Sequence, residues 1–369
     1  MGLVDQCVIT LDGVDGSEWV IHGAGSKRSP VRLLEGSVGD LIDPPVSTTY
    51  KARVGQAGSQ YRGHRVEERF IVLDVIVFGD SGLDWGRTDS DFRKALAYDK
   101  DARIRVTTQL SGERYIHVRL SEQPELNGDH DPGEQGAALY TLTLVAADPF
   151  WRSDTYTDEF VFDGMNWYGG SVTIDNPGDV DCWPKWVLDG QARAILPDWN
   201  EERTIVLPFL TGSNSAVVDT DPMEEMITTT NDVLTWADMN GQFFMNPVPG
   251  YTKPTSVPVS IDPLPRLDIV LPPGWREWIA QRLQVWATRL GVEGVLGASA
   301  EDVATEIRAV ITGATPSWLQ PLSSTILGRL TINYLTQKIA DAYINVSNIA
   351  GATVQVRLER RWTRPWGLE

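Results

Sequence analysis

Short strand-like runs separated by turn residues recur along most of this chain, and this rhythm restricts the folds it can adopt. In the segment 114–122 every second residue is apolar, so one face carries Ile116, Val118 and Leu120. The segments 102–108 and 140–146 alternate in the same way. The sequence therefore predicts strands packed on one side against a core, with 102–108 and 114–122 paired as a hairpin.

Two further elements are predicted in the first 150 residues. The run ERFIVLDVIVFG (68–79) is apolar on both faces, which is typical of a strand covered on both sides. One helix is expected at roughly 89–98, after this strand. Asp89 or Ser90 would cap it, and its apolar stripe would consist of Phe92, Ala95 and Leu96.

The pattern changes near residue 150 and again near residue 272. Proline cannot donate to a strand ladder, so we predict an interdomain junction formed by Asp148, Pro149, Phe150 and Trp151. From 155 to 271, short runs rich in β-branched and aromatic residues alternate with turns such as NPGD, as in a β-sandwich. Helical periodicity then follows, and strand alternation returns after Gly351 with Val354, Val356 and Leu358.

These patterns predict a mainly β (α+β) chain in three parts. A β-rich domain with one helix, a β-sandwich or barrel in form, would span 1–150. A second β-sandwich would combine 151–271 with 351–369, and an α-helical insertion would occupy 272–350. A length of 369 residues favours two or three cores over one.

Charge and segment composition exclude several classes of protein. The net charge is −18, and residues 154–270 carry about 19 acidic against about 5 basic side chains, which disfavours direct nucleic-acid binding. No run reaches the ~18 apolar residues that a membrane span needs. The N-terminus lacks the basic start and apolar run of a secretory signal, so the protein is expected to be made in the cytoplasm. Cys7 and Cys182 are interpreted as buried apolar residues that form no disulfide framework.

No catalytic, metal or cofactor site is predicted. The four histidines (His22, His64, His117 and His130) do not have the spacing of zinc ligands. The loop GDHD (128–131) has too few further ligands for a metal site. No nucleophile motif occurs, and the many paired carboxylates single out no glycosidase pair.

Fourteen tryptophans are about three times the usual share and require a reason. Three alternatives are open for them: core packing with cover of a sheet edge, contact with a partner, and a sugar-binding platform. In CWPKW, Pro184 would mark a strand start and let one tryptophan enter the core while the other covers an edge. The candidate interface or edge aromatics are Trp183, Trp186, Trp362, Trp366, Trp275, Trp278 and Trp286.

Several phrases resemble a known family. LYTLTLVAADPFWRS, VTIDNPGDVDCWPKWVLDG and the closing RRWTRPWG are similar to the distal tail proteins of long-tailed bacteriophages, and more narrowly to minor tail proteins of actinobacterial phages. The resemblance covers about 65–271 and 352–367, and the helical stretch departs from it. It implies an N-terminal domain that forms a ring, commonly of six copies, and a galectin-like outer sandwich.

That resemblance implies a structural protein of the virion tail tip, not an enzyme and without a cofactor. The implied partners are further copies of the chain, the tail tube protein, and the tail hub and fibre proteins, with genomic DNA only passing through the lumen. A host surface glycan is a further candidate partner. The alternative function is a carbohydrate-binding module that recognises host cell-wall glycans, which would need exposed, coplanar tryptophans. A wall-degrading glycosidase would need two carboxylates facing each other across a cleft.

Overall fold

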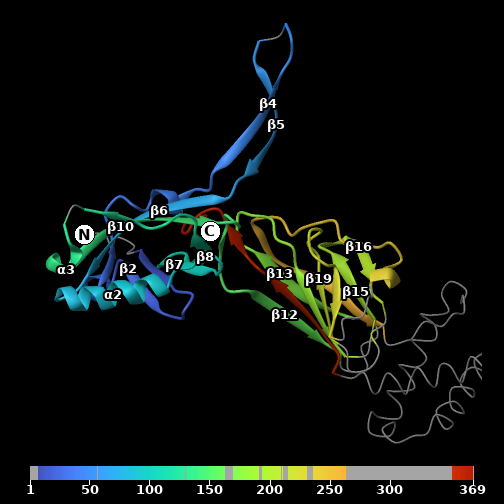
Figure 1. Ribbon diagram of the computed structural model, residues 1–369. Coiled ribbons are helices and arrows are strands. Elements are labelled where there is room, and N and C mark those ends of the chain that lie inside the picture. The colour runs from blue at the N-terminus through green and yellow to red at the C-terminus, as the bar shows by residue number, and fades with distance from the viewer. Residues whose placement is uncertain are drawn as a thin grey trace, which may run out of the picture.

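The described part of the chain consists of two β-rich units and a projecting ribbon (Figure 1). The computed structural model describes residues 7–55, 57–128, 130–162, 169–190, 193–208, 210, 215–230, 236–262 and 351–368. Each unit has its own cluster of buried apolar side chains. The prediction of a mainly β chain is confirmed. The predicted helical insertion at 272–350 lies outside the described residues.

The N-terminal unit is one sheet that curls into a nearly closed barrel. Its main strands follow the order β2-β1-β7-β8-β10-β6-β3, and the two end strands, β2 and β3, lie next to each other. The strand bounds are β1 (Val8–Asp12), β2 (Glu18–His22), β3 (Val31–Leu33), β6 (Arg69–Phe78), β7 (Ala102–Thr108), β8 (Gly112–Leu120), β9 (Glu125–Asn127) and β10 (Ala137–Ala146). The short helical turns are η1 (Ser26–Arg28), α1 (Gly39–Ile42) and α3 (Pro132–Gln135).

The C-terminal unit is a sandwich of two antiparallel sheets. One has the order β12-β20-β14-β17-β18 and the other β13-β19-β15-β16. The bounds in the first sheet are β12 (Tyr156–Val161), β14 (Lys185–Asp189), β17 (Ala216–Asp219), β18 (Ile227–Thr229) and β20 (Thr353–Leu358). In the second they are β13 (Gly170–Asn176), β15 (Arg193–Asp198), β16 (Asn200–Val206) and β19 (Thr252–Asp262), with η2 (Trp236–Met239) before β19.

Two short strands connect the units. β11 (Trp151–Arg152) pairs with β21 (Arg361–Trp362) and with β8 of the barrel. β20, although it comes near the C-terminus, lies between β12 and β14 in the sandwich. The last residues of the chain therefore leave the sandwich and return to the barrel (Figure 1).

Alternation predicted the strands that have one buried face. In β8, Ile116, Val118 and Leu120 point inward and the residues between them point outward, and β7 pairs with β8 as the predicted hairpin. In β20, Val354 and Val356 are buried in the sandwich core. These predictions are confirmed because a strand with one covered face must place every second side chain inside.

The predicted helix start was wrong. Helix α2 runs from Gly82 to Lys94, and the side chain of Ser81 accepts a hydrogen bond from the Asp84 amide at its N-terminus. The Asp84 carboxylate in turn accepts from the Asp80 amide, which completes a reciprocal cap. Phe92, Ala95 and Leu96 are buried as expected, but the helix ends before the last two of them.

The expectation that residues 68–79 are covered on both sides was wrong for a single copy of the chain. One face of β6 enters the barrel core, with Ile71, Leu73 and Val75 at most 1% exposed. On the other face Phe70 is 51% and Val72 is 39% exposed. Large apolar side chains on the outside of a barrel indicate a contact surface.

We expect the two thiols to differ sharply in reactivity. Cys182 is buried next to Val248, and burial raises the pKa of its thiol to about 11, whereas Cys7 is only half-buried. Since the thiolate is the reactive form, a maleimide at pH 8 should label Cys182 at least about 100-fold more slowly than a free cysteine. Mass spectrometry of the labelled peptides measures this, and denaturant should abolish the difference between the two. Rapid labelling of Cys182 in the folded protein would contradict the burial.

Candidate assembly surfaces

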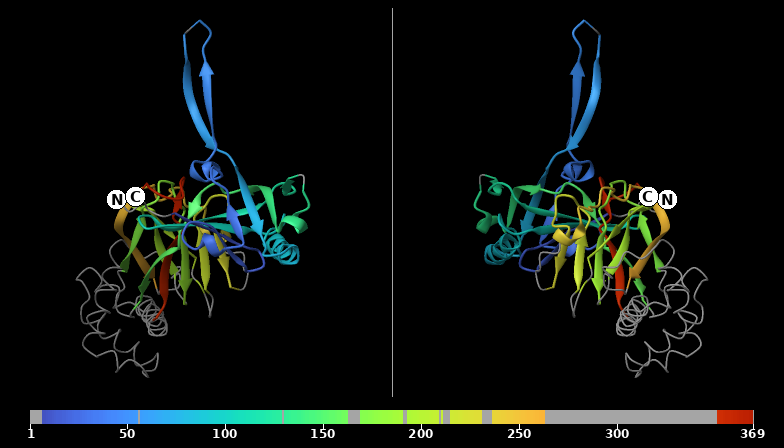
Figure 2. Two further views of the ribbon diagram at one scale, coloured as in Figure 1. Left: turned by 90° about the vertical axis from the view of Figure 1, so that its left-hand side faces the viewer. Right: turned by 90° about the vertical axis from the view of Figure 1, so that its right-hand side faces the viewer.

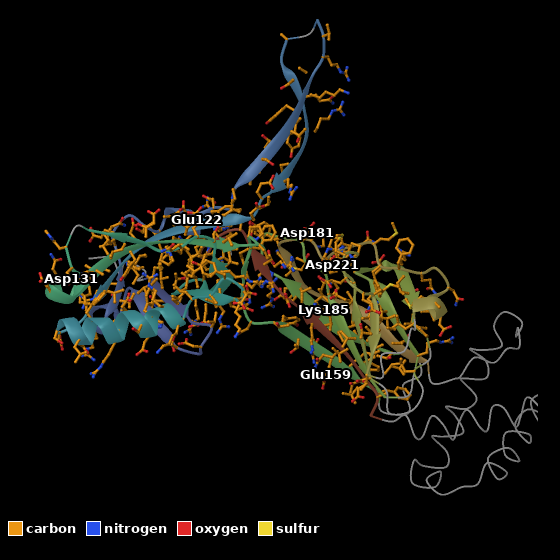
Figure 3. The ribbon with its side chains drawn as sticks, in the orientation of Figure 1. Glu122, Asp131, Glu159, Asp181, Lys185 and Asp221 are labelled. Carbon is orange, nitrogen blue, oxygen red and sulfur yellow. The ribbon has the colours of Figure 1, made fainter. Side chains whose placement is uncertain are left out.

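A two-stranded ribbon projects from the barrel and stands clear of both units (Figures 1 and 2). It consists of β4 (Val46–Ala52) and β5 (Ser59–Val66), which pair only with each other. We call residues 46–66 the arm. Every residue described in β4 is exposed, and the side chains along the arm point away from the ribbon without meeting the body (Figure 3).

The pairing register gives the arm an apolar and a polar face. Val46 is opposite Val66, and Tyr50 is opposite Tyr61 beyond a bulge that leaves Arg62 unmatched. The two tyrosine rings meet edge to face with centroids 5.7 Å apart, and the Tyr61 hydroxyl lies 2.6 Å from Nδ1 of His64. The opposite face carries pairs such as Ser47 with Arg65 and Lys51 with Gln60.

The arm is basic in an acidic chain. It contains Lys51, Arg53, Arg62 and Arg65 and no acidic residue, although the chain has a net charge of −18. An isolated two-stranded hairpin is marginally stable in water because neither face is covered. Arg65 pairs with Glu67 just past the base, and the other three cations leave the arm positively charged beside its uncovered apolar face. The arm therefore has the features of a surface that is completed by a partner.

Arg69 fixes the base of the arm from inside the barrel. The residue is 1% exposed, and its guanidinium donates to the carbonyls of Leu41 at 2.8 Å and Asp40 at 3.3 Å, just before the arm begins. It also donates to the carbonyl of Thr363 at 2.9 Å. Desolvation lowers the pKa of Arg69 to about 10, so the side chain is still charged at neutral pH.

The C-terminal segment 359–368, which we call the clasp, packs into the barrel. Trp362 is 5% exposed and lies opposite Trp151 in the β11–β21 pair. The guanidinium of Arg114 lies 4.3 Å from the Trp362 ring centroid and donates to the carbonyls of Arg364 and Gly367. The Trp151 indole donates to the Leu41 carbonyl, the same group that Arg69 contacts. The clasp and the base of the arm therefore share one set of contacts.

The turn NPGD (176–179) holds the clasp on the sandwich side. The Asp179 carboxylate accepts from the amide of Thr363 at 2.8 Å, and Arg360 pairs with Asp175. Gly178 passes so close to the clasp that an added Cβ would lie 2.1 Å from the Arg361 carbonyl oxygen. Only glycine fits at this position, since backbone atoms cannot yield as a side chain can.

Of the four predicted junction residues, Asp148 and Trp151 contact the clasp, through Arg361 and Trp362. Arg152 forms ion pairs with Asp148 at 2.6 Å and with Glu359 of the clasp at 2.9 Å. Pro149 is buried, Phe150 is half-buried, and Trp151 is fully buried in the barrel core. Of the terminal tryptophans, Trp366 is half-buried and packs against the same core as Trp362.

Trp183 and Trp186 belong to the sandwich and not to the clasp. Trp186 is fully buried in the sandwich core, and Trp183 is half-buried just before β14. Trp275, Trp278 and Trp286 lie outside the described residues. Every tryptophan whose side chain the structure describes is buried or half-buried, so these residues form no exposed sugar platform.

The arm was missed by the sequence analysis, although it leaves two signals. The glycines at 55 and 58 mark a turn after the run VSTTY, and four cations occur without an acidic residue. Within the described part of the chain, no three His, Cys, Asp or Glu side chains gather as metal ligands would. None of the helices described there is long and apolar enough to cross a membrane.

Comparison with known proteins identifies relatives. No protein-family model matches the sequence. The chain is 27% identical over 308 residues to minor tail protein Gp27 of Mycobacterium phage L5, with 68% of this chain and 90% of the relative covered. Minor tail protein Gp27 of Mycobacterium phage D29 is 28% identical with the same coverage. The chain is thus similar to minor tail proteins of two mycobacteriophages.

Solved tail structures show weaker likeness. The Dit protein (gp 19.1) of phage SPP1, described as a paradigm of the hub adsorption apparatus in phages that infect Gram-positive hosts, aligns with a TM-score of 0.44 and 16% identity, covering 69% of this chain and 96% of that one. A chain of the phage P2 baseplate aligns with a TM-score of 0.41 and 14% identity, covering 70% and 98%. The family resemblance indicated by the sequence is confirmed by the tail-protein relatives.

Proposed function

We propose that this protein is a structural subunit of a phage tail tip, in which copies of the chain join through their arms into a closed ring. The observation that carries the proposal is the arm, a ribbon with an uncovered apolar face that no part of the described chain contacts beyond its base. A protruding element that fits a different surface on the next copy makes a heterologous contact, and such contacts form a ring when the rotation from copy to copy closes.

The relatives support a structural role in the tail over an enzymatic one, since they are named minor tail proteins. The ring would have about six copies, as the family resemblance implies, and would join the tail tube to the hub and fibre proteins. In this arrangement the clasp holds the sandwich and the arm in a fixed relation, so that the sandwich is a rigid platform at the tail tip for host attachment.

The test compares the full chain with a variant that lacks the arm. Val46 and Val66 are directly paired, so Asn-Gly can replace residues 47–65 as a two-residue hairpin turn. We expect light scattering and negative-stain images to show a closed ring for the full chain and a monomer for the shortened one, with similar thermal unfolding. The proposal is wrong if the shortened chain assembles equally well, or if the full chain stays monomeric at every concentration reached.

A further inference from the structure

Two outer faces of the barrel differ in chemistry. On β7 and β8 the outward side chains are charged and paired, for example Arg105 with Asp12 at 2.9 Å and Arg119 with Asp101 at 2.5 Å. On β6 and β10 the outward side chains are mostly apolar. We call this surface the β6–β10 face; its outward residues are Phe70, Val72, Asp74, Ile76 and Phe78 on β6, and Ala137, Leu139, Thr141, Thr143 and Val145 on β10.

The apolar residues of the β6–β10 face are paired across the strands. Phe70 lies opposite Val145, and Ile76 lies opposite Leu139. The polar centre needs no outside partner, because the Thr141 hydroxyl donates to Asp74 at 2.6 Å. A solvated face would carry charged side chains here, as β7 and β8 do. The apolar pattern of β6 therefore indicates that another surface covers this face in the assembled protein.

The rim of this face is acidic. Glu125 lies on β9 at the edge of β10, and Glu122 follows Ser121, whose amide donates to the Thr143 carbonyl of β10. Figure 3 shows Glu122 on the side of the body from which the arm rises. Both carboxylates are exposed. An apolar centre with an acidic rim is complementary to a ribbon that is apolar on one face and carries only positive charge.

We propose that the apolar face of one copy's arm lies across the β6–β10 face of a second copy. Within one chain the arm rises away from this face, so the two surfaces can meet only between copies (Figure 2). Tyr50 and Tyr61 would cover Phe70 and Val72. The long side chains of Lys51 and Arg62 would reach past the edge of the ribbon to Glu122 and Glu125. This inference rests on the proposed ring and names the receiving surface within it.

Charge exchange tests this contact in the full chain. The arm variant carries K51E and R62E, and the face variant carries E122K and E125K. We expect each pair alone to raise the concentration at which half of the chains assemble by about tenfold or more. All four changes together should bring it back to within about threefold, because each exchanged charge would again meet its opposite.

An apolar variant provides a second measurement. Phe70→Ser should raise the same midpoint by about tenfold or more, because it removes half-exposed apolar surface from the contact. Met223→Ser is the matched control, since Met223 is 88% exposed and belongs to the sandwich, between β17 and β18, and not to the β6–β10 face. Its midpoint should not change, and thermal unfolding checks that both variants fold.

The outcomes separate this inference from the proposed function. If the arm variant weakens assembly while the face variants have no effect, or if the combined variant does not recover, the arm docks on another surface and this inference is overturned. The ring proposal would remain in that case. If instead the chain without its arm still forms rings, the ring proposal itself fails.

Discussion

Replacing Arg69 with methionine is expected to lower the free energy of unfolding by about 3 kcal/mol. The guanidinium donates to the carbonyls of Asp40, Leu41 and Thr363, and methionine fills similar space without a donor. Hydrogen bonds from a charged donor contribute about 1.5–3 kcal/mol each, and an orphaned buried carbonyl adds a desolvation cost. Methionine also removes the cost of burying a charge, the same desolvation that lowers the pKa of Arg69. The net loss is therefore smaller than the sum of the three hydrogen-bond contributions.

Arg103→Met is the matched control for Arg69→Met. Arg103 pairs with Asp12 at 2.9 Å on the outside of the barrel, and 43% of its side chain is exposed, so its loss should cost less than about 1 kcal/mol. Urea denaturation measures both variants. Hydrogen exchange should also accelerate in the clasp of Arg69→Met, because Thr363 loses a contact. Equal losses in the two variants would mean that Arg69 does not hold the clasp.

The strands with one buried face could be predicted from the sequence, and the arm could not. In β8 and β20 every second residue is apolar because one face of the strand packs against a core. This alternation is visible within a few residues of sequence. In β4 no residue enters a core. Its two faces differ, as Tyr50 and the neighbouring Lys51 show, but the difference is not a regular alternation of apolar and polar residues. Pattern reasoning finds a covered face, and the arm is not covered within its own chain.

The clasp also could not be predicted, for a different reason. The sequence marks Trp362 as a candidate interface or edge aromatic, but its ring packs against Arg114, almost 250 positions away. The role of Gly178 depends equally on a distant carbonyl, that of Arg361. The sequence could identify Trp151 and Trp362 as notable residues, but it could not show that they pair with each other. Contacts between residues this far apart in the sequence depend on the topology of the fold, and they leave no repeating pattern in the local sequence.

The apparent error on β6 has a physical meaning. A strand that is apolar on both faces predicts cover on both sides, and the structure of one chain provides cover on one side only. The sequence of a subunit is constrained by the assembled particle as well as by its own fold. Under the proposed ring, the second apolar face of β6 would be covered by the neighbouring copy, whose arm is proposed to lie there.

Replacing Trp362 with alanine is expected to cost about 4 kcal/mol. The side chain is 5% exposed in the barrel core, and a buried tryptophan replaced by alanine leaves a cavity as well as lost apolar contacts. The control is Trp366→Ala on the same clasp, where a half-buried ring should cost roughly half as much. Calorimetry of both variants measures the difference. Similar small losses in both would show that the clasp is only loosely packed on the barrel.

The Trp362 variant also decides whether the clasp makes the barrel and the sandwich unfold together. Hydrogen exchange in β14, which carries Trp186, reports on the sandwich core alone, because Trp186 is buried among the residues of that unit. If the clasp couples the units, Trp362→Ala should split one unfolding transition into two, with the barrel transition at the lower temperature. Adding Arg114→Met should cost less in the Trp362→Ala background than alone, by about 0.5–1 kcal/mol, since the cation–π contact is already gone. Additive losses would show that Arg114 acts only through its bonds to the Arg364 and Gly367 carbonyls. The clasp would then be held by its backbone, with the Trp362 ring contributing burial alone.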